Sequence, residues 1–142
     1  MLTMARVADV LGLPDKLVPD SPMALMARIE DGLPLAALDR VAAMVAPGDT
    51  QFKYRLVPRA TYERRKGKKV LSAEEGTRLT RVARVWGQAV DVWGTQAEAR
   101  DFLFRPHAML ENERPIDVVI QSEFGAEMVS DILRGLKYGS AA

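Results

Sequence analysis

The sequence predicts an all-α fold, on two observations. Apolar residues recur at intervals of three and four along almost the whole chain, and the apolar–polar alternation of a half-buried strand is hard to find. Glycine and proline interrupt this pattern often enough to divide it into short helices. Of the 142 residues, 48% are hydrophobic and 27% charged, as in a globular protein of one domain or of two small domains that share a core.

The chain opens with two short predicted helices. Residues 4–11 form the first, which ends at Gly12 and Pro14. Ser21 caps the second, Pro22 takes its first position and Gly32 ends it. We expect four apolar residues of the second helix to face inward, namely Met23, Met26, Ala27 and Ile29.

Two more helices precede a basic segment. Pro34 opens a helix with an apolar stripe, which Pro47 and Gly48 end. Asp49 or Thr50 then caps a brief helix through residues 52–56.

The next segment carries the positive charge of the chain. After Pro58 we expect a basic helix from Arg59 to Lys66 that ends at Gly67. Residues 53–69 hold eight basic side chains and one acid, a charge of +7, against −6 for the rest of the chain. The net charge of +1 therefore conceals a short segment that can meet a polyanion.

The second half has clearer helix signals. Ser72 and Glu75 form a capping box at the start of a long helix that Gly94 ends, and Thr95 with Glu98 repeats the pattern. Three later signals are Pro106 as a helix stop, Pro115 as a first helical residue and Ser122 as the cap of the last helix.

Two apolar stripes define the expected core of this half. In the long helix the stripe is Leu79, Val82, Val85, Trp86, Ala89, Val90 and Trp93. In the last helix it is Phe124, Met128, Val129, Ile132, Leu133 and Leu136. We therefore expect two helical modules packed together, residues 1–69 and residues 70–142.

The sequence offers few candidate catalytic residues. The chain has no cysteine, which excludes thiol catalysis and zinc–thiolate sites. His107 is the only histidine and follows a proline, so we interpret it as an exposed or helix-capping imidazole. We expect a non-enzymatic protein that needs no cofactor, without a signal peptide or membrane span, in the cytoplasm.

The basic segment has the layout of a helix-turn-helix, because a short helix and a break precede the basic helix. In that motif the second helix enters the major groove, where arginine reads guanine and other cations bind phosphates. The alternative is a solvated basic face, or a patch that docks an acidic protein. The candidate DNA-binding residues are Lys53, Arg55, Arg59, Thr61, Tyr62, Arg64, Arg65, Lys66, Lys68 and Lys69.

The second half carries a family pattern. It includes Leu71-Ser72-Ala73-Glu74-Glu75, Arg81-Val82-Ala83-Arg84-Val85, Phe102-Leu103 with Pro106, and Gly125, Val129, Leu133 and Gly139. With this spacing the chain resembles the toxin-binding domain of Xre/MbcA/ParS-type antitoxins. Residues 57–65 are similar to that family's helix-turn-helix, although Ala60 separates Arg59 from Thr61. Phe102, where the family often has tryptophan, is a further departure.

The resemblance implies a partner and a mechanism. The partner would be a RES-domain toxin, which consumes NAD or transfers ADP-ribose, and the C-terminal module would cover its active site. The final segment suits that role because it joins an amphipathic helix to a glycine-containing tail. The candidate toxin-binding residues are Arg134, Lys137, Tyr138 and Gly139.

Two further expectations concern DNA. The antitoxin would also repress its own operon, and a homodimer is expected because helix-turn-helix proteins usually bind paired half-sites. The alternative hypothesis is a stand-alone helix-turn-helix transcriptional regulator, which rests on the basic segment alone. An enzyme that uses His107 with a nearby carboxylate is a third, weaker alternative.

Overall fold

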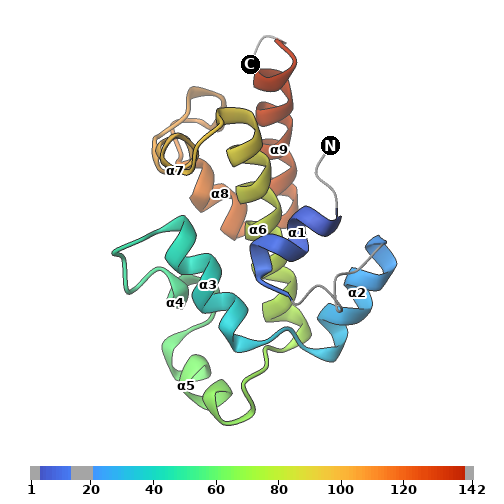
Figure 1. The fold of residues 1–142 in the computed structure, drawn as a ribbon. Helices are drawn as coiled ribbons and strands as arrows, with labels where there is room; N and C mark the ends of the chain where they lie inside the picture. The colour runs from blue at the N-terminus through green and yellow to red at the C-terminus, as the bar shows by residue number, and fades with distance from the viewer. Residues whose placement is uncertain (1–3, 14–20, 140–142) are drawn as a thin grey trace.

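The computed structural model describes residues 4–13 and 21–139, and every regular element in these ranges is helical (Figure 1). This confirms the all-α prediction. Pro14 and the chain beyond Gly139 lie outside the described residues. The elements are α1 (Met4–Leu11), α2 (Pro22–Asp31), α3 (Leu35–Val45), α4 (Lys53–Leu56), α5 (Arg59–Lys68), α6 (Ala73–Trp93), α7 (Gln96–Phe104), a 3₁₀ turn (Ala108–Leu110), α8 (Pro115–Gln121) and α9 (Glu123–Lys137).

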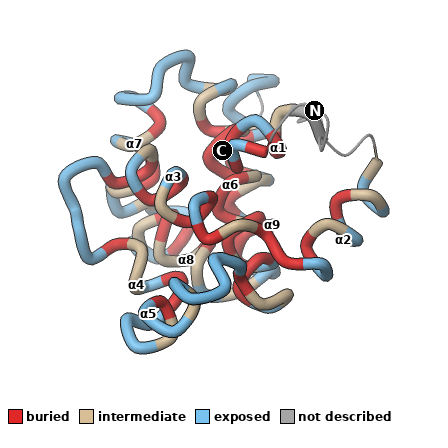
Figure 2. Tube along the Cα trace, turned by 60° about the horizontal axis from the view of Figure 1, so that its bottom comes forward, coloured by how far each residue is buried: buried red, intermediate tan, exposed pale blue. Residues whose placement is uncertain are grey.

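Helix α6 is the centre of the fold. It is 21 residues long, and α1, α2, α3, α7, α8 and α9 all pack against it. Figure 1 shows α9 alongside the C-terminal half of α6, and Figure 2 shows buried residues along the length of α6. Leu79, Val82 and Trp86 are each at most 2% exposed. Both halves of the chain therefore share one hydrophobic core.

The predicted helix caps are confirmed at four positions. Ser72 accepts a hydrogen bond from the Glu75 N–H, and the Glu75 carboxylate accepts one from the Ser72 N–H, which completes the capping box. Ser21 and Ser122 accept from the N–H three residues on. Thr95 accepts from the Glu98 N–H at 3.1 Å, but among the described residues Glu98 does not return the bond, so the expected second capping box is only half formed. These bonds satisfy N–H groups that have no partner inside the helix.

The basic helix is longer than expected. We expected α5 to end at Gly67, but it continues to Lys68, and Lys69 adopts the left-handed conformation with φ 61°. The hydrogen bond from the Leu35 N–H to the Lys69 carbonyl, at 2.9 Å, ties the exit of α5 to the start of α3. This tertiary contact fixes the end of the helix one residue after Gly67, with Lys69 as its C-cap.

The start of α4 also differs from the prediction. Phe52, 1% exposed, stands at its N-cap without a side-chain hydrogen bond. Asp49 instead accepts a hydrogen bond from the Gln51 N–H at 2.9 Å, so it closes a turn before the helix.

The inward face of α2 was predicted correctly at Ile29 and wrongly at Met23, Met26 and Ala27. Met23 is 72% exposed, Met26 is 57% exposed and Ala27 is also exposed, whereas Leu25 and Ile29 are buried. Ile29 packs close to Gly76 of α6, where an added Cβ would lie 3.3 Å from its side chain. A ten-residue helix that touches the core along one narrow line buries only the residues on that line.

Within the described residues, no helix is long and apolar enough to cross a membrane.

Candidate functional site

The basic segment forms α4 and α5, separated by Val57 and Pro58. Three of its cations, Lys53, Arg55 and Arg65, hold the segment in place. The Lys53 amine lies 3.3 Å from an Asp39 carboxylate oxygen and 3.2 Å from the Tyr62 hydroxyl. Tyr62 is 6% exposed, and its hydroxyl donates to Asp39 at 2.8 Å. Burial lowers the pKa of Lys53, but the Tyr62 and Asp39 hydrogen bonds outweigh it and raise that pKa above its ordinary value.

Arg65 also serves to anchor α5. Its guanidinium donates to both oxygens of Glu75, at 3.0 and 3.1 Å. Burial by itself would raise the pKa of Glu75, but hydrogen bonds from Arg65 and from the Ser72 N–H hold that pKa below its usual value. Arg55 of α4 reaches across to α8 and donates to Asp117 at 2.8 Å.

The other predicted DNA-binding side chains are more accessible. Arg59 is exposed, donates to Gln51 at 2.8 Å and lies 4.1 Å from the centre of the Tyr54 ring. Lys66 pairs with Glu63 at 2.9 Å, and Arg64 donates to the Thr61 hydroxyl at 3.3 Å. Arg64, Lys68 and Lys69 are exposed and form no ion pair with any described residue. The exposed cations therefore lie on α5 and just after it, except for Arg55 of α4, which Asp117 holds.

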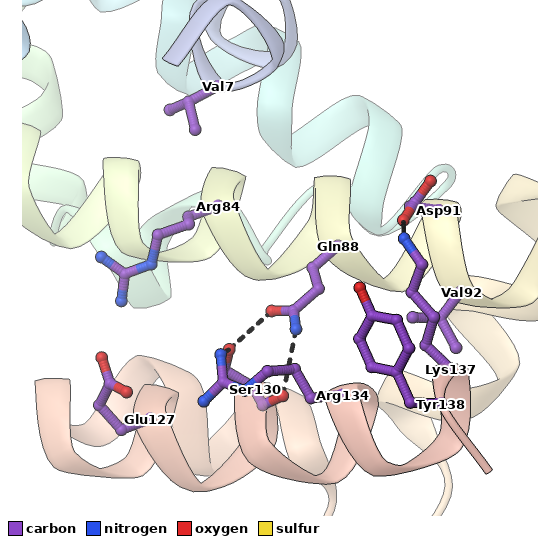
Figure 3. Close-up of a pocket in the computed structure, with 10 residues that line it drawn as sticks. All are labelled: Val7, Arg84, Gln88, Asp91, Val92, Glu127, Ser130, Arg134, Lys137 and Tyr138. Atoms are coloured by element: carbon purple, nitrogen blue, oxygen red, sulfur yellow. Dashed lines mark hydrogen bonds and ion pairs between the residues drawn. The ribbon is translucent and has the colours of Figure 1, made fainter. Parts of the chain in front are cut away.

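A second surface lies at the end of α9, beside a groove of about 410 Å³ (Figure 3). Gln88 of α6 and Ser130 of α9 exchange two hydrogen bonds, at 2.8 and 3.1 Å. Lys137 pairs with Asp91 at 2.5 Å, and this hydrogen bond is the main cause that raises the pKa of Lys137 and lowers that of Asp91. These contacts fasten the last turns of α9 to α6.

The predicted toxin-binding residues gather at this surface. Figure 3 shows Arg134, Lys137 and Tyr138 on the wall of the groove. Arg134 pairs with Asp131 and Tyr138 is 66% exposed. Gly139 follows with φ 72°, a left-handed conformation that favours glycine.

Family models match both halves of the chain. Residues 24–84 match the antitoxin Xre-like helix-turn-helix domain, and residues 88–139 match the antitoxin Xre/MbcA/ParS C-terminal toxin-binding domain. The chain belongs to the Xre/MbcA/ParS antitoxin family. It is thus an antitoxin of a toxin–antitoxin system, and the resemblance seen in the sequence is confirmed. No curated protein matches the chain significantly.

Three large apolar side chains of the antitoxin's last helix, α9, are exposed, although the sequence predicts them in the core. Phe124 is 77% exposed, and Met128 and Leu136 are each 37% exposed. The residues of α9 that pack against its neighbours are Gly125, Ala126, Val129, Ile132 and Leu133.

The sequence does contain a signal for this outcome. Gly125 and Ala126 mark where the backbone of α9 approaches α8, and an added Cβ at Gly125 would lie 2.2 Å from the Val118 carbonyl oxygen. On a helical wheel centred on those small residues, Phe124, Met128 and Tyr138 fall on the outer side. We call these three side chains the outer stripe of α9.

Other sequence expectations concern His107 and the tryptophans. His107 Nδ1 accepts a hydrogen bond from the Met109 N–H at 3.1 Å, which confirms it as a capping residue. Trp86 is buried as expected, whereas Trp93 is 37% exposed. No group of three potential metal-binding side chains gathers within the described ranges.

Proposed function

We propose that this antitoxin neutralises a RES-domain toxin, an enzyme that consumes NAD or transfers ADP-ribose, by covering its active site with the C-terminal module: the outer side of α9 binds the toxin and the end of α9 masks the active site. One observation carries the proposal: the outer stripe of α9, with side chains exposed by 37 to 77%, lies inside the segment that matches a toxin-binding domain. Large exposed apolar side chains on a rigid helix are typical of protein interfaces.

The chemistry of the helix end supports a role in masking an active site. Tyr138 offers an aromatic ring with a polar tip, which suits a hot spot of binding. Arg134 and Lys137 bring two positive charges that can pair with acidic groups of the toxin, and Gly139 lets the chain turn there. The Lys137–Asp91 pair holds the helix end in one position before the toxin arrives.

Co-purification with the product of the adjacent reading frame tests this proposal. We expect the complex to form with the wild-type chain and to weaken strongly in Phe124→Asp, because a charge would enter the apolar contact. The matched control is Met23→Asp, which changes a similarly exposed side chain outside the toxin-binding match. Equal loss in both variants, or in neither, would contradict the proposal.

We further propose that α5 binds operator DNA and represses the antitoxin's own operon. The exposed Arg59, Arg64 and Lys66 of α5, with Lys68 and Lys69 after them, would make the contacts, and Thr61 holds Arg64. Lys53, Arg55, Tyr62 and Arg65 would act indirectly, since their bonds to Asp39, Asp117 and Glu75 position α4 and α5.

Fluorescence anisotropy with the DNA upstream of the gene tests the DNA contacts. Arg64→Ala should weaken binding by roughly tenfold and flatten its salt dependence. Arg105→Ala, which removes an exposed arginine after α7, is the control and should bind as the wild type does. No binding by the wild type at low salt would remove the proposal.

The remaining proposals follow from these two. A regulator of this kind would act in the cytoplasm as a homodimer, with two copies of α5 set against paired half-sites. Its role would be regulatory, without a catalytic residue or a cofactor. Light scattering of the purified chain measures the stoichiometry.

A further inference from the structure

A second groove lies on another side of the end of α9, with a volume of about 400 Å³. The end of α6, the outer side of α7, the turn after α7 and one residue of α9 form its walls. Its lining includes Trp93, Phe102, His107 and Leu136, with the charged side chains of Glu98, Asp101 and Arg105.

The floor of this groove is aromatic. Trp93 is 37% exposed, and its ring centre lies 5.8 Å from that of Phe102. The Phe102 ring in turn meets His107 edge-on, at 5.9 Å. His107 is fixed by its hydrogen bond to the Met109 N–H, so the aromatic side chains support one another in a single arrangement. An exposed indole held in this way is a preformed platform.

The rim carries negative charge. Glu98 and Asp101 both line the groove on α7. Asp101 is neutralised by Arg105 at 2.7 Å, whereas Glu98 forms no ion pair with any residue in the described ranges. Because the face of an indole ring attracts cations, a free carboxylate beside Trp93 makes the groove complementary to a positive side chain.

We propose that this groove receives an arginine or lysine side chain of the toxin, stacked on Trp93 and paired with Glu98. The inference rests on the proposed function and adds a second contact to it. Two observations favour the toxin as the occupant. Every residue of the groove lies inside the toxin-binding match, and Leu136 in its wall directly precedes Lys137 and Tyr138. A toxin that covers the end of α9 therefore reaches this groove without leaving the same interface.

Calorimetric titration of the toxin encoded in the adjacent reading frame with antitoxin variants tests this inference. Trp93→Leu and Glu98→Gln should each weaken the complex by roughly tenfold, the range of a cation–π contact or an ion pair that excludes water. The double variant should lose less than the product of the two single losses, because both residues act on one toxin side chain.

The matched control is Glu74→Gln. Glu74 lies in the first turn of α6 as Glu98 does in α7, so both changes remove a similar helix-terminal charge. The Glu74 variant should bind the toxin as the wild type does. Thermal unfolding of all variants shows whether Trp93→Leu weakens binding by destabilising the fold. If it does, Glu98→Gln still tests the inference, because Glu98 is exposed and its substitution leaves the core intact.

The outcomes separate the two proposals. Absence of any complex with the wild-type chain would overturn the proposed function. If the wild-type chain binds the toxin and the Trp93→Leu and Glu98→Gln variants bind it with the same affinity, the proposal about the groove is overturned and the proposed function is not. If the loss of affinity in the double variant equals the product of the two single losses, the groove proposal is also contradicted, since the two residues would then contact different parts of the toxin.

Discussion

Glu75 links the start of α6 to α5 with one carboxylate. It completes the capping box of α6, it accepts two hydrogen bonds from Arg65 of α5, and its side chain is only 10% exposed. The capping box could be predicted from the spacing of Ser72 and Glu75, because capping is a local interaction. The bond to Arg65 could not, because it depends on how α5 turns back toward α6.

The Glu75 carboxylate should make stability depend on acid pH. Its pKa in the folded protein lies below the ordinary 4.5, so its contribution is complete above that value and is lost as the pH falls through the folded pKa. We expect Glu75→Gln to lower the free energy of unfolding by about 1–2 kcal/mol at neutral pH. Between about pH 6 and pH 3 the two unfolding free energies should converge, as urea titrations can measure. A constant difference over this range would contradict the ionic role.

Phe124 shows the limit of prediction at the scale of residues. A phenylalanine in an amphipathic helix is usually buried, yet here it is the most exposed of the large apolar side chains described. The stripe predicted for α9 includes every large apolar residue of the helix, and it is too wide to be covered by one neighbouring surface. The helices that pack against α9 therefore decide which of these side chains stay exposed. For this reason, sequence patterns alone assign exposed apolar residues of a binding surface, such as Phe124, to the core.

At the scale of elements, the corner between α8 and α9 depends on a glycine. A Cβ at Gly125 would lie 2.2 Å from the backbone oxygen of Val118, and a backbone atom cannot move aside as a flexible side chain can. Gly67, inside α5, has no atom within 4 Å of the position that a Cβ would take. The two glycines therefore occupy opposite situations within helices.

Alanine substitutions at these glycines should have opposite effects. Gly125→Ala should destabilise the protein by about 1–3 kcal/mol, because α8 and α9 must separate. Gly67→Ala should stabilise it by about 0.5–1 kcal/mol, because alanine favours an open helical position. Chemical denaturation measures both, and a stabilised Gly125→Ala would show that the helices do not meet as described.

Most helix boundaries were predicted correctly at both ends, because their signals are local. Glycines end α1, α2 and α6 where expected. Serine, threonine and proline at the first positions act locally, so α2, α6, α7, α8 and α9 begin where expected. The end of α5 depends instead on the hydrogen bond between Leu35 and Lys69, which joins residues far apart in sequence. The faces of α2 and α9 depend in the same way on their partners.

At the scale of the whole molecule, α6 connects two surfaces that lie far apart. Figure 1 shows α5 at one end of the molecule and the end of α9 at the other. Three arginines of α6 tie the parts together: Arg78 donates to the Leu56 carbonyl, Arg81 to the carbonyls of Val119 and Ile120, and Arg84 to Glu123. The family and fold could be predicted from sequence, whereas this separation required the structure.

The separation predicts that DNA and toxin can bind together. A toxin seated on the end of α9 leaves α5 uncovered, so the complex should still bind operator DNA. Electrophoretic mobility shifts should show a slower band when toxin is added to the antitoxin–DNA complex. Release of the DNA at equal concentrations of toxin would contradict this arrangement.

Inhibition by the end of α9 is the central claim, and one measurement tests it most directly: NAD consumption by the proposed RES-domain toxin, with the 142-residue chain and with a chain that lacks residues 138–142. The shortened chain keeps the Lys137–Asp91 pair and most of the outer stripe, so it should still form a complex. The account predicts that the 142-residue chain suppresses NAD consumption and that the shortened chain, though bound, does not. Equal suppression by both chains would contradict it.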